Sequence, residues 1–111
     1  MKRLDSLLRG YRFQLDEHRR EIGDLERLAA RLRQERDKIE PQQKAAEAEK
    51  APAPQSQALA ERRAHIEQSL AGIETQLRQA REGLSEAYHG LRRHEIAAAS
   101  RAEQKRRRQA I

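Results

Sequence analysis

The fold is decided by residues 59–98, LAERRAHIEQSLAGIETQLRQAREGLSEAYHGLRRHEIAA, in which apolar residues recur in alternating steps of four and three. This spacing repeats every 3.5 residues, and it is typical of the seam along which two helices of a coiled coil interlock their side chains. Only Arg63 and His94 interrupt the apolar pattern. The seam positions are Leu59, Arg63, Ile66, Leu70, Ile73, Leu77, Ala80, Leu84, Ala87, Leu91, His94 and Ala98.

An earlier segment of the chain carries a second seam with the same period. It is also mostly apolar, with His18 and Arg36 as its polar positions. We interpret His18 and His94 as polar interruptions that select the register at some cost in stability. The positions of this seam are Leu4, Leu8, Tyr11, Leu15, His18, Ile22, Leu25, Ala29, Leu32, Arg36 and Ile39.

A Pro-rich segment, EPQQKAAEAEKAPAPQS at 40–56, separates the two seams. Pro41 lacks an amide proton and disfavours helix at the preceding residue, so it is expected to end or kink the first helix. We expect the chain to reverse at residues 51–54, Ala-Pro-Ala-Pro, and Ser56 to cap the next helix. The prediction is a single domain over 1–111, with helices at about 3–40 and 57–108 and a turn region at about 41–56.

Two helices of similar length joined by one short segment predict an all-α fold, a long two-helix antiparallel coiled-coil hairpin. One register sets Ala29 opposite Ile73 and Leu15 opposite Ala87, so that a small residue faces a large one. A register one heptad away fits nearly as well, and an intermolecular coiled coil stays open. The large residues expected in the seam are Leu8, Leu15, Ile22, Leu25, Leu32, Ile66, Leu70, Ile73, Leu77, Leu84 and Leu91.

Charge is concentrated near the two chain ends. The formal net charge is +6, yet residues 1–12 carry +3 and residues 92–111 carry +5, which leaves −2 for the middle. A hairpin would bring these basic segments together as one tip that attracts acidic partners. A frayed, solvated helix end would explain the run at 105–108 equally simply. The candidate partner-binding residues are Lys2, Arg3, Arg9, Arg101, Lys105, Arg106, Arg107 and Arg108.

Enzymatic chemistry is not indicated by this sequence. There is no cysteine and no Gly-rich phosphate-binding loop, and the four histidines lack metal-ligand spacing. We therefore expect no catalytic residue, no cofactor, no metal and no small-molecule substrate. Because no apolar run reaches membrane-spanning length and no secretory signal is apparent, we expect a cytoplasmic protein without an integral membrane segment.

The chain opens with a basic stretch that runs into an amphipathic helix, KRLDSLLRGYRFQLDEHRREIGDLERL, and it closes with the helix LRRHEIAAASRAEQKRRRQAI. In this arrangement the chain resembles, across its whole length, the flagellar FliJ family. Within the closing helix, Glu95, Glu103, Gln104 and Lys105 follow the family pattern, whereas many relatives have an acidic pair where this chain has Arg106 and Arg107.

The resemblance implies a stalk or coupling component of the flagellar type III protein-export apparatus. Such proteins associate with the hexameric export ATPase, the cytoplasmic domain of the export gate and export chaperones, at the cytoplasmic face of the membrane-embedded apparatus. On that basis the basic tip would face the ATPase ring, and the end near Pro52 and Pro54 would meet the gate. The alternatives are a generic coiled-coil scaffold or adaptor, and a small basic nucleic-acid-associated protein, which the scarcity of aromatic residues disfavours.

Overall fold

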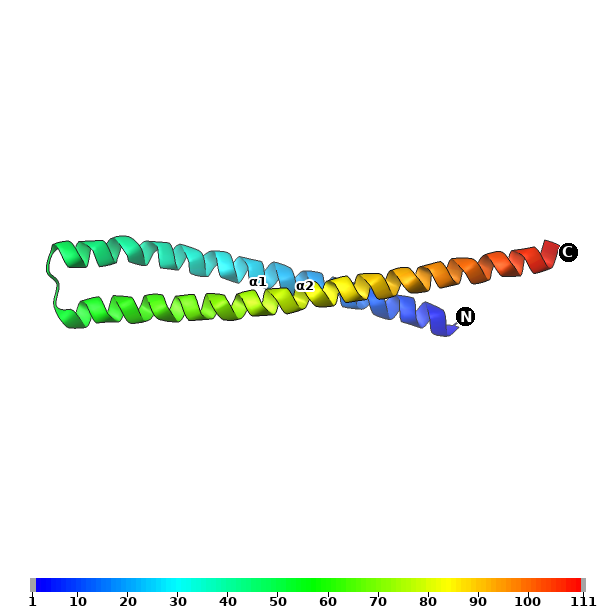
Figure 1. The fold of residues 1–111 in the computed structure, drawn as a ribbon, viewed down its shortest axis with the longest axis horizontal. Helices are drawn as coiled ribbons and strands as arrows, with labels where there is room; N and C mark the ends of the chain where they lie inside the picture. The colour runs from blue at the N-terminus through cyan, green and yellow to red at the C-terminus, as the bar shows by residue number, and fades with distance from the viewer. Residues whose placement is uncertain (1, 111) are drawn as a thin grey trace. The chain divides into compact units, whose positions relative to one another are not determined.

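The computed structural model describes residues Lys2–Ala110, which form two long α-helices (Figure 1). Helix α1 spans Lys2–Ala48 and helix α2 spans Ala53–Ala110. Residues 49–52 connect them, and no strand occurs among the described residues.

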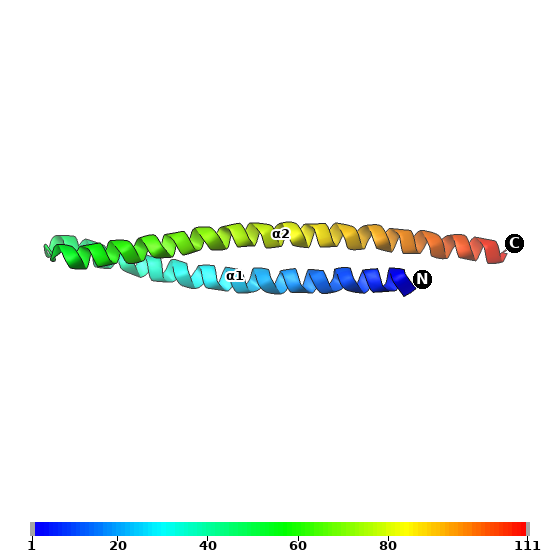
Figure 2. The ribbon, with the colours of Figure 1, turned by 90° about the horizontal axis from the view of Figure 1, so that it is seen from below.

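These residues divide into two units, each of which pairs a segment of α1 with a segment of α2. The terminal unit comprises residues 2–22 and 79–110, and the loop unit comprises residues 23–78, which include the connection. In both units the paired segments run in opposite directions (Figures 1 and 2). The predicted fold class, an all-α antiparallel hairpin of two long helices, is therefore confirmed.

The two seams supply the core of both units. All seam leucines and isoleucines of the prediction are buried or half-buried. In the terminal unit Leu15, Ala87 and Leu91 form one cluster, against which Leu8, Tyr11 and Leu84 pack, as the predicted register requires. Each fully buried leucine or isoleucine stabilises the pairing by about 1.5–3 kcal/mol. The buried hydrophobic side chains are Leu15, Ala29, Ile39, Ile66, Leu70, Ile73, Leu77, Ala80, Ala87 and Leu91.

Helix α1 does not end near residue 40, as the sequence predicted, but continues through Pro41 to Ala48. The next seam steps after Ile39 fall on Gln43 and Ala46, and both are half-buried. Gln43 Oε1 also accepts a hydrogen bond of 3.0 Å from Nη1 of Arg63 on α2. The proline removes one backbone hydrogen bond, and these contacts with α2 offset that loss.

The turn is closed by a Schellman motif at the end of α1. The amide of Ala51 donates to the carbonyl of Ala46 at 2.9 Å, and that of Lys50 donates to the carbonyl of Glu47 at 3.2 Å. This motif places one residue in the left-handed region, which here is Lys50 with φ of 50°. The reversal therefore occupies residues 49–52, which overlap the predicted Ala-Pro-Ala-Pro run at Ala51 and Pro52.

Helix α2 begins at Ala53, four residues before the predicted start near 57. The carbonyl of Pro52 accepts the amides of Gln55 at 3.0 Å and Ser56 at 3.4 Å, so Pro52 occupies the cap position. Pro54 lies in the first turn, where a backbone amide has no partner in the helix and its loss costs little. The prediction that Ser56 caps this helix was wrong, because Ser56 lies inside the first turn.

Candidate protein-binding surface

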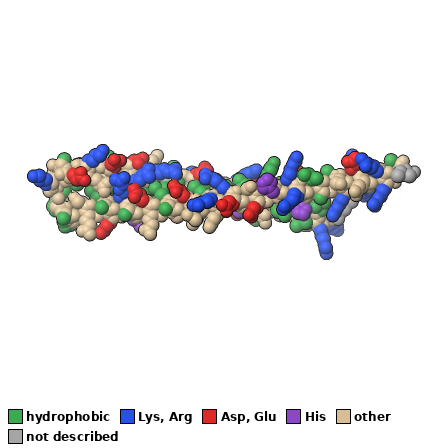
Figure 3. All heavy atoms as spheres, viewed as in Figure 1, with side chains coloured by type: hydrophobic (Ala, Val, Ile, Leu, Met, Phe, Trp, Pro, Cys, Tyr) green, Lys and Arg blue, Asp and Glu red, His purple; other side chains and the backbone are tan. Residues whose placement is uncertain are grey.

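The net positive charge of the molecule resides entirely in the terminal unit. Of the 24 basic and 18 acidic residues, the loop unit holds ten of each and is neutral. The terminal unit therefore carries the whole formal excess of +6. It contains all of the candidate partner-binding residues, and each of their side chains is exposed. Figure 3 shows several Lys and Arg side chains over the C-terminal part of α2.

The C-terminal part of α2 extends past the first described residue of α1. Continuing the register from the Leu15–Ala87 pair sets Lys2 opposite Ser100, and in Figures 1 and 2 the red end of α2 reaches beyond the blue end of α1. Residues 101–110 are all exposed. We call this segment the overhang. It carries Arg101, Lys105, Arg106, Arg107 and Arg108, while Lys2, Arg3 and Arg9 lie on the neighbouring part of α1.

A surface hollow lies where α1 meets the overhang. From α1 it is lined by Leu4 and Asp5. The α2 lining combines small apolar side chains with cations and comprises Ala98, Arg101, Ala102, Lys105, Arg106 and Gln109. The hollow therefore combines apolar surface with three cations and one carboxylate.

Few of the overhang's charges are neutralised within it. Arg107 Nη2 lies 3.1 Å from Glu103 Oε1, one turn away on the same helix. Both side chains are more than half exposed, so such a pair contributes only about 0.3–0.5 kcal/mol and is screened by salt. The remaining cations face solvent and are available to an acidic partner.

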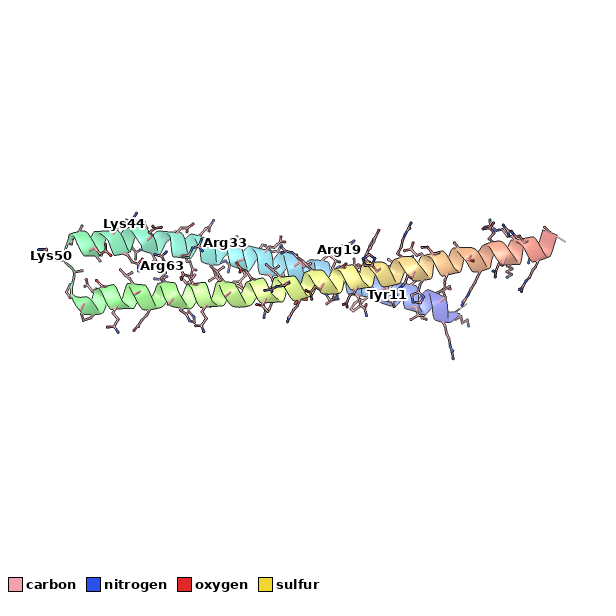
Figure 4. All side chains as sticks on the ribbon, viewed as in Figure 1. Tyr11, Arg19, Arg33, Lys44, Lys50 and Arg63 are labelled. Carbon is pink, nitrogen blue, oxygen red and sulfur yellow. The ribbon has the colours of Figure 1, made fainter. Side chains whose placement is uncertain are left out.

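Two aromatic rings pack against glycines in the terminal unit. The Tyr11 ring stacks on His94, with centroids 5.3 Å apart and planes 27° apart, and it lies beside Gly90. Tyr11 is labelled on α1 in Figure 4. His18 lies in the same way beside Gly83. The sequence analysis missed this pairing of ring and glycine. The sequence feature that could have indicated this pairing is the seven-residue spacing of Gly83 and Gly90, which lie next to seam positions.

His18 is the one seam histidine with an unsatisfied polar atom among the described residues. Its Nδ1 is buried without a hydrogen bond and lies 4.0 Å from Oε2 of Glu21. No group of three or more His, Asp or Glu side chains in the described part of the chain could hold a metal ion.

The exposed large apolar side chains do not form a second core. Leu7, Phe13, Tyr88 and Ile96 are exposed in the terminal unit, and Leu28 in the loop unit. Isolated exposed apolar residues are normal on protein surfaces. Between Lys2 and Ala110, neither helix contains a stretch apolar enough to cross a membrane.

The geometry therefore identifies one candidate surface, which consists of the overhang, the adjoining hollow and the basic start of α1. It combines exposed cations with small apolar side chains. No protein-family model matches this chain, and no curated protein or solved structure shows significant similarity to it.

Proposed function

We propose that this chain is a stalk or coupling component of the flagellar type III protein-export apparatus. It binds the hexameric export ATPase with the basic surface of its terminal unit. The observation that carries the proposal is the segregation of charge, with the full excess of +6 on one unit and none on the other. The confirmed helical hairpin is the fold that the FliJ resemblance implies.

The basic surface suits a partner that presents an acidic surface. A strongly positive surface is attracted to an acidic pore at a distance, and the attraction weakens as salt shortens the screening length to about 8 Å at physiological ionic strength. In this proposal the exposed cations at 105–108 face the ring and hold the helix pair there. The chain itself performs no chemistry.

The loop unit is the proposed contact for the cytoplasmic domain of the export gate, near Pro52 and Pro54, and export chaperones are a further proposed partner of the chain. It is neutral, and its turn is held by the Schellman motif and by the hydrogen bond between Arg63 and Gln43. Figure 4 shows Lys50 at the turn, pointing away from both helices. A fixed turn of this kind presents a constant shape to a partner.

The test measures binding to the export ATPase of the same organism and the rate of ATP hydrolysis. The test variant changes the four cations at 105–108 to Gln, and the control changes Arg31, Arg33, Lys38 and Arg62 of the loop unit to Gln. Both remove four exposed positive charges. We expect the native chain and the control to raise the hydrolysis rate and the test variant to lose the effect. A native chain that stays helical but does not bind in moderate salt would overturn the proposal.

A second candidate function is association with nucleic acid, which the exposed cations of the overhang favour because they can neutralise phosphates. Binding of duplex DNA or RNA that persists at physiological ionic strength, with a steep salt dependence, would support it. A generic coiled-coil scaffold is the remaining alternative, and it predicts no effect on the ATPase.

A further inference from the structure

The seam of α2 changes chemistry at the point where α1 no longer lies opposite it. Continuing the steps of four and three past Ala98 reaches Arg101, Lys105 and Arg108. The stripe that buries Leu91 against α1 is therefore continued by a row of three exposed cations on the same face of the same helix. We call this row the cationic seam.

The hollow at the end of α1 lies on this face. The α2 residues that line it include two members of the cationic seam, Arg101 and Lys105, together with Ala98 and Ala102. Leu4, the first described seam residue of α1, also lines it. The hollow thus occupies the place that a further turn of a paired helix would fill.

We propose that the cationic seam binds an α-helix of a partner protein, one that carries Asp or Glu at steps of four and three. Its carboxylates would meet Arg101, Lys105 and Arg108, and a small or apolar residue would enter the hollow between Leu4 and the two alanines. The inference rests on the proposed function, since it names the chemistry of the partner that the basic surface takes.

The arrangement of the surface favours a helix over other acidic partners. Residues three and four apart on a helix lie about 5–6 Å apart, which matches the carboxylate spacing of a second helix packed alongside. Ala98 and Ala102 are small, so a helix backbone can approach closely. Residues 97–110 include no aromatic ring on which a base could stack, and 101–110 include no large apolar residue that could enter a membrane.

Pairing with a second helix would also give the overhang the tertiary packing that it lacks. A helical segment of this length is marginally stable in water without tertiary packing. A partner helix would bury its seam face and protect its amides. Binding is therefore expected to slow hydrogen exchange at 101–110 more than at any other segment.

The probe is a synthetic helical peptide of about three turns, with Glu at steps of four and three and Ala elsewhere. A second peptide has the same composition with the Glu residues scattered around the helix. Two variants of the full chain each remove three exposed charges. One variant is R101Q/K105Q/R108Q in the cationic seam, and the other is R19Q/R92Q/R93Q, at three exposed arginines of the terminal unit that are not candidate partner-binding residues.

We expect the patterned peptide to bind the native chain and the second variant with similar affinity at physiological salt. Loss of three charged contacts should weaken binding to the cationic-seam variant about tenfold. Equal losses in both variants would overturn the inference, as would equal binding of the two peptides. Tighter binding of duplex DNA or of anionic phospholipid vesicles than of the patterned peptide would also overturn it.

The peptide experiment contains no export ATPase, so it fails or succeeds separately from the proposed function. A cationic-seam variant that loses the peptide but still stimulates the ATPase supports the inference and contradicts the proposed site. A chain that stimulates the ATPase but binds both peptides equally supports the function and overturns the inference.

Discussion

The ring of Tyr11 occupies the space that a side chain at Gly90 would need. A Cβ built at Gly90 would lie 2.5 Å from Cε1 of Tyr11, well inside van der Waals contact. Gly90 is itself buried, and the ring that covers it also stacks on His94. The helix therefore accepts a residue of poor helix propensity at this position in exchange for the packing of an aromatic ring.

Replacing Gly90 with alanine should destabilise the terminal unit. An alanine raises helix propensity by about 1 kcal/mol, but it would displace Tyr11 and its stack on His94. We expect a net loss of about 1 kcal/mol. Gly72→Ala is the control, because a Cβ there meets no atom within 4 Å, and it should stabilise by about 0.5–1 kcal/mol. Urea unfolding followed by circular dichroism compares the two, and equal gains in stability would contradict the packing argument.

A double-mutant cycle isolates the contact between Tyr11 and Gly90. In a Tyr11→Ala background the obstructing ring is absent, so Gly90→Ala should become stabilising by about 1 kcal/mol. The change of sign between the two backgrounds measures the coupling of the two residues. If Gly90→Ala has the same effect in both, the ring does not determine the choice of glycine.

The hydrophobic period was sufficient to predict both helices and their pairing. Leu15, Leu70 and Leu77 are buried as the steps of four and three require, because seam spacing is a local property of the sequence. The eight candidate cations could also be identified from the sequence, because charges can be counted without a structure. The hollow could not be predicted, because it depends on which residue of α2 lies opposite Leu4.

The ends of the helices at the turn depended on contacts that the sequence does not display. Gln43 is polar and Ala46 is small, so the apolar signal weakens after Pro41, yet both residues are half-buried and continue the seam of α1. Lys50 adopts the left-handed conformation that glycine usually occupies at the end of a helix. Its role in the turn could therefore not be predicted from the sequence. Tertiary contact and backbone hydrogen bonding decided both features.

Lys50→Gly should stabilise the turn. A residue with a side chain pays about 1 kcal/mol to adopt the left-handed region, and glycine avoids that strain while retaining the Schellman hydrogen bonds. Allowing for the greater freedom of glycine in the unfolded chain, we expect a gain of about 0.5 kcal/mol. Lys44→Gly, inside α1, should instead cost about 1 kcal/mol. A loss of stability in both variants would show that the Lys50 side chain contributes more than its strain costs.

Pro41→Ala should stabilise α1 because it restores a backbone hydrogen bond within a continuous helix. Proline inside a helix costs about 3 kcal/mol relative to alanine, and the native contacts on either side recover part of that cost, so we expect a gain of about 2 kcal/mol. Pro52→Ala is the matched control, since Pro52 precedes α2 and caps it only through its carbonyl. Thermal unfolding measures both, and an unchanged midpoint for Pro41→Ala would mean that α1 already ends at the proline in solution.

Leu70→Asp tests the seam on which the whole hairpin depends. Leu70 is 6% exposed, and a carboxylate there would be buried without a partner, which costs several kcal/mol and should remove much of the helical signal. Leu28→Asp makes the same chemical change at a leucine that is 41% exposed beside the seam, and it should cost less than about 0.5 kcal/mol. Circular dichroism at 222 nm reports the helix content of both variants. If Leu70→Asp remains as helical and as stable as Leu28→Asp, the seam is not the source of pairing, and the two helices must be held together by their charged flanks.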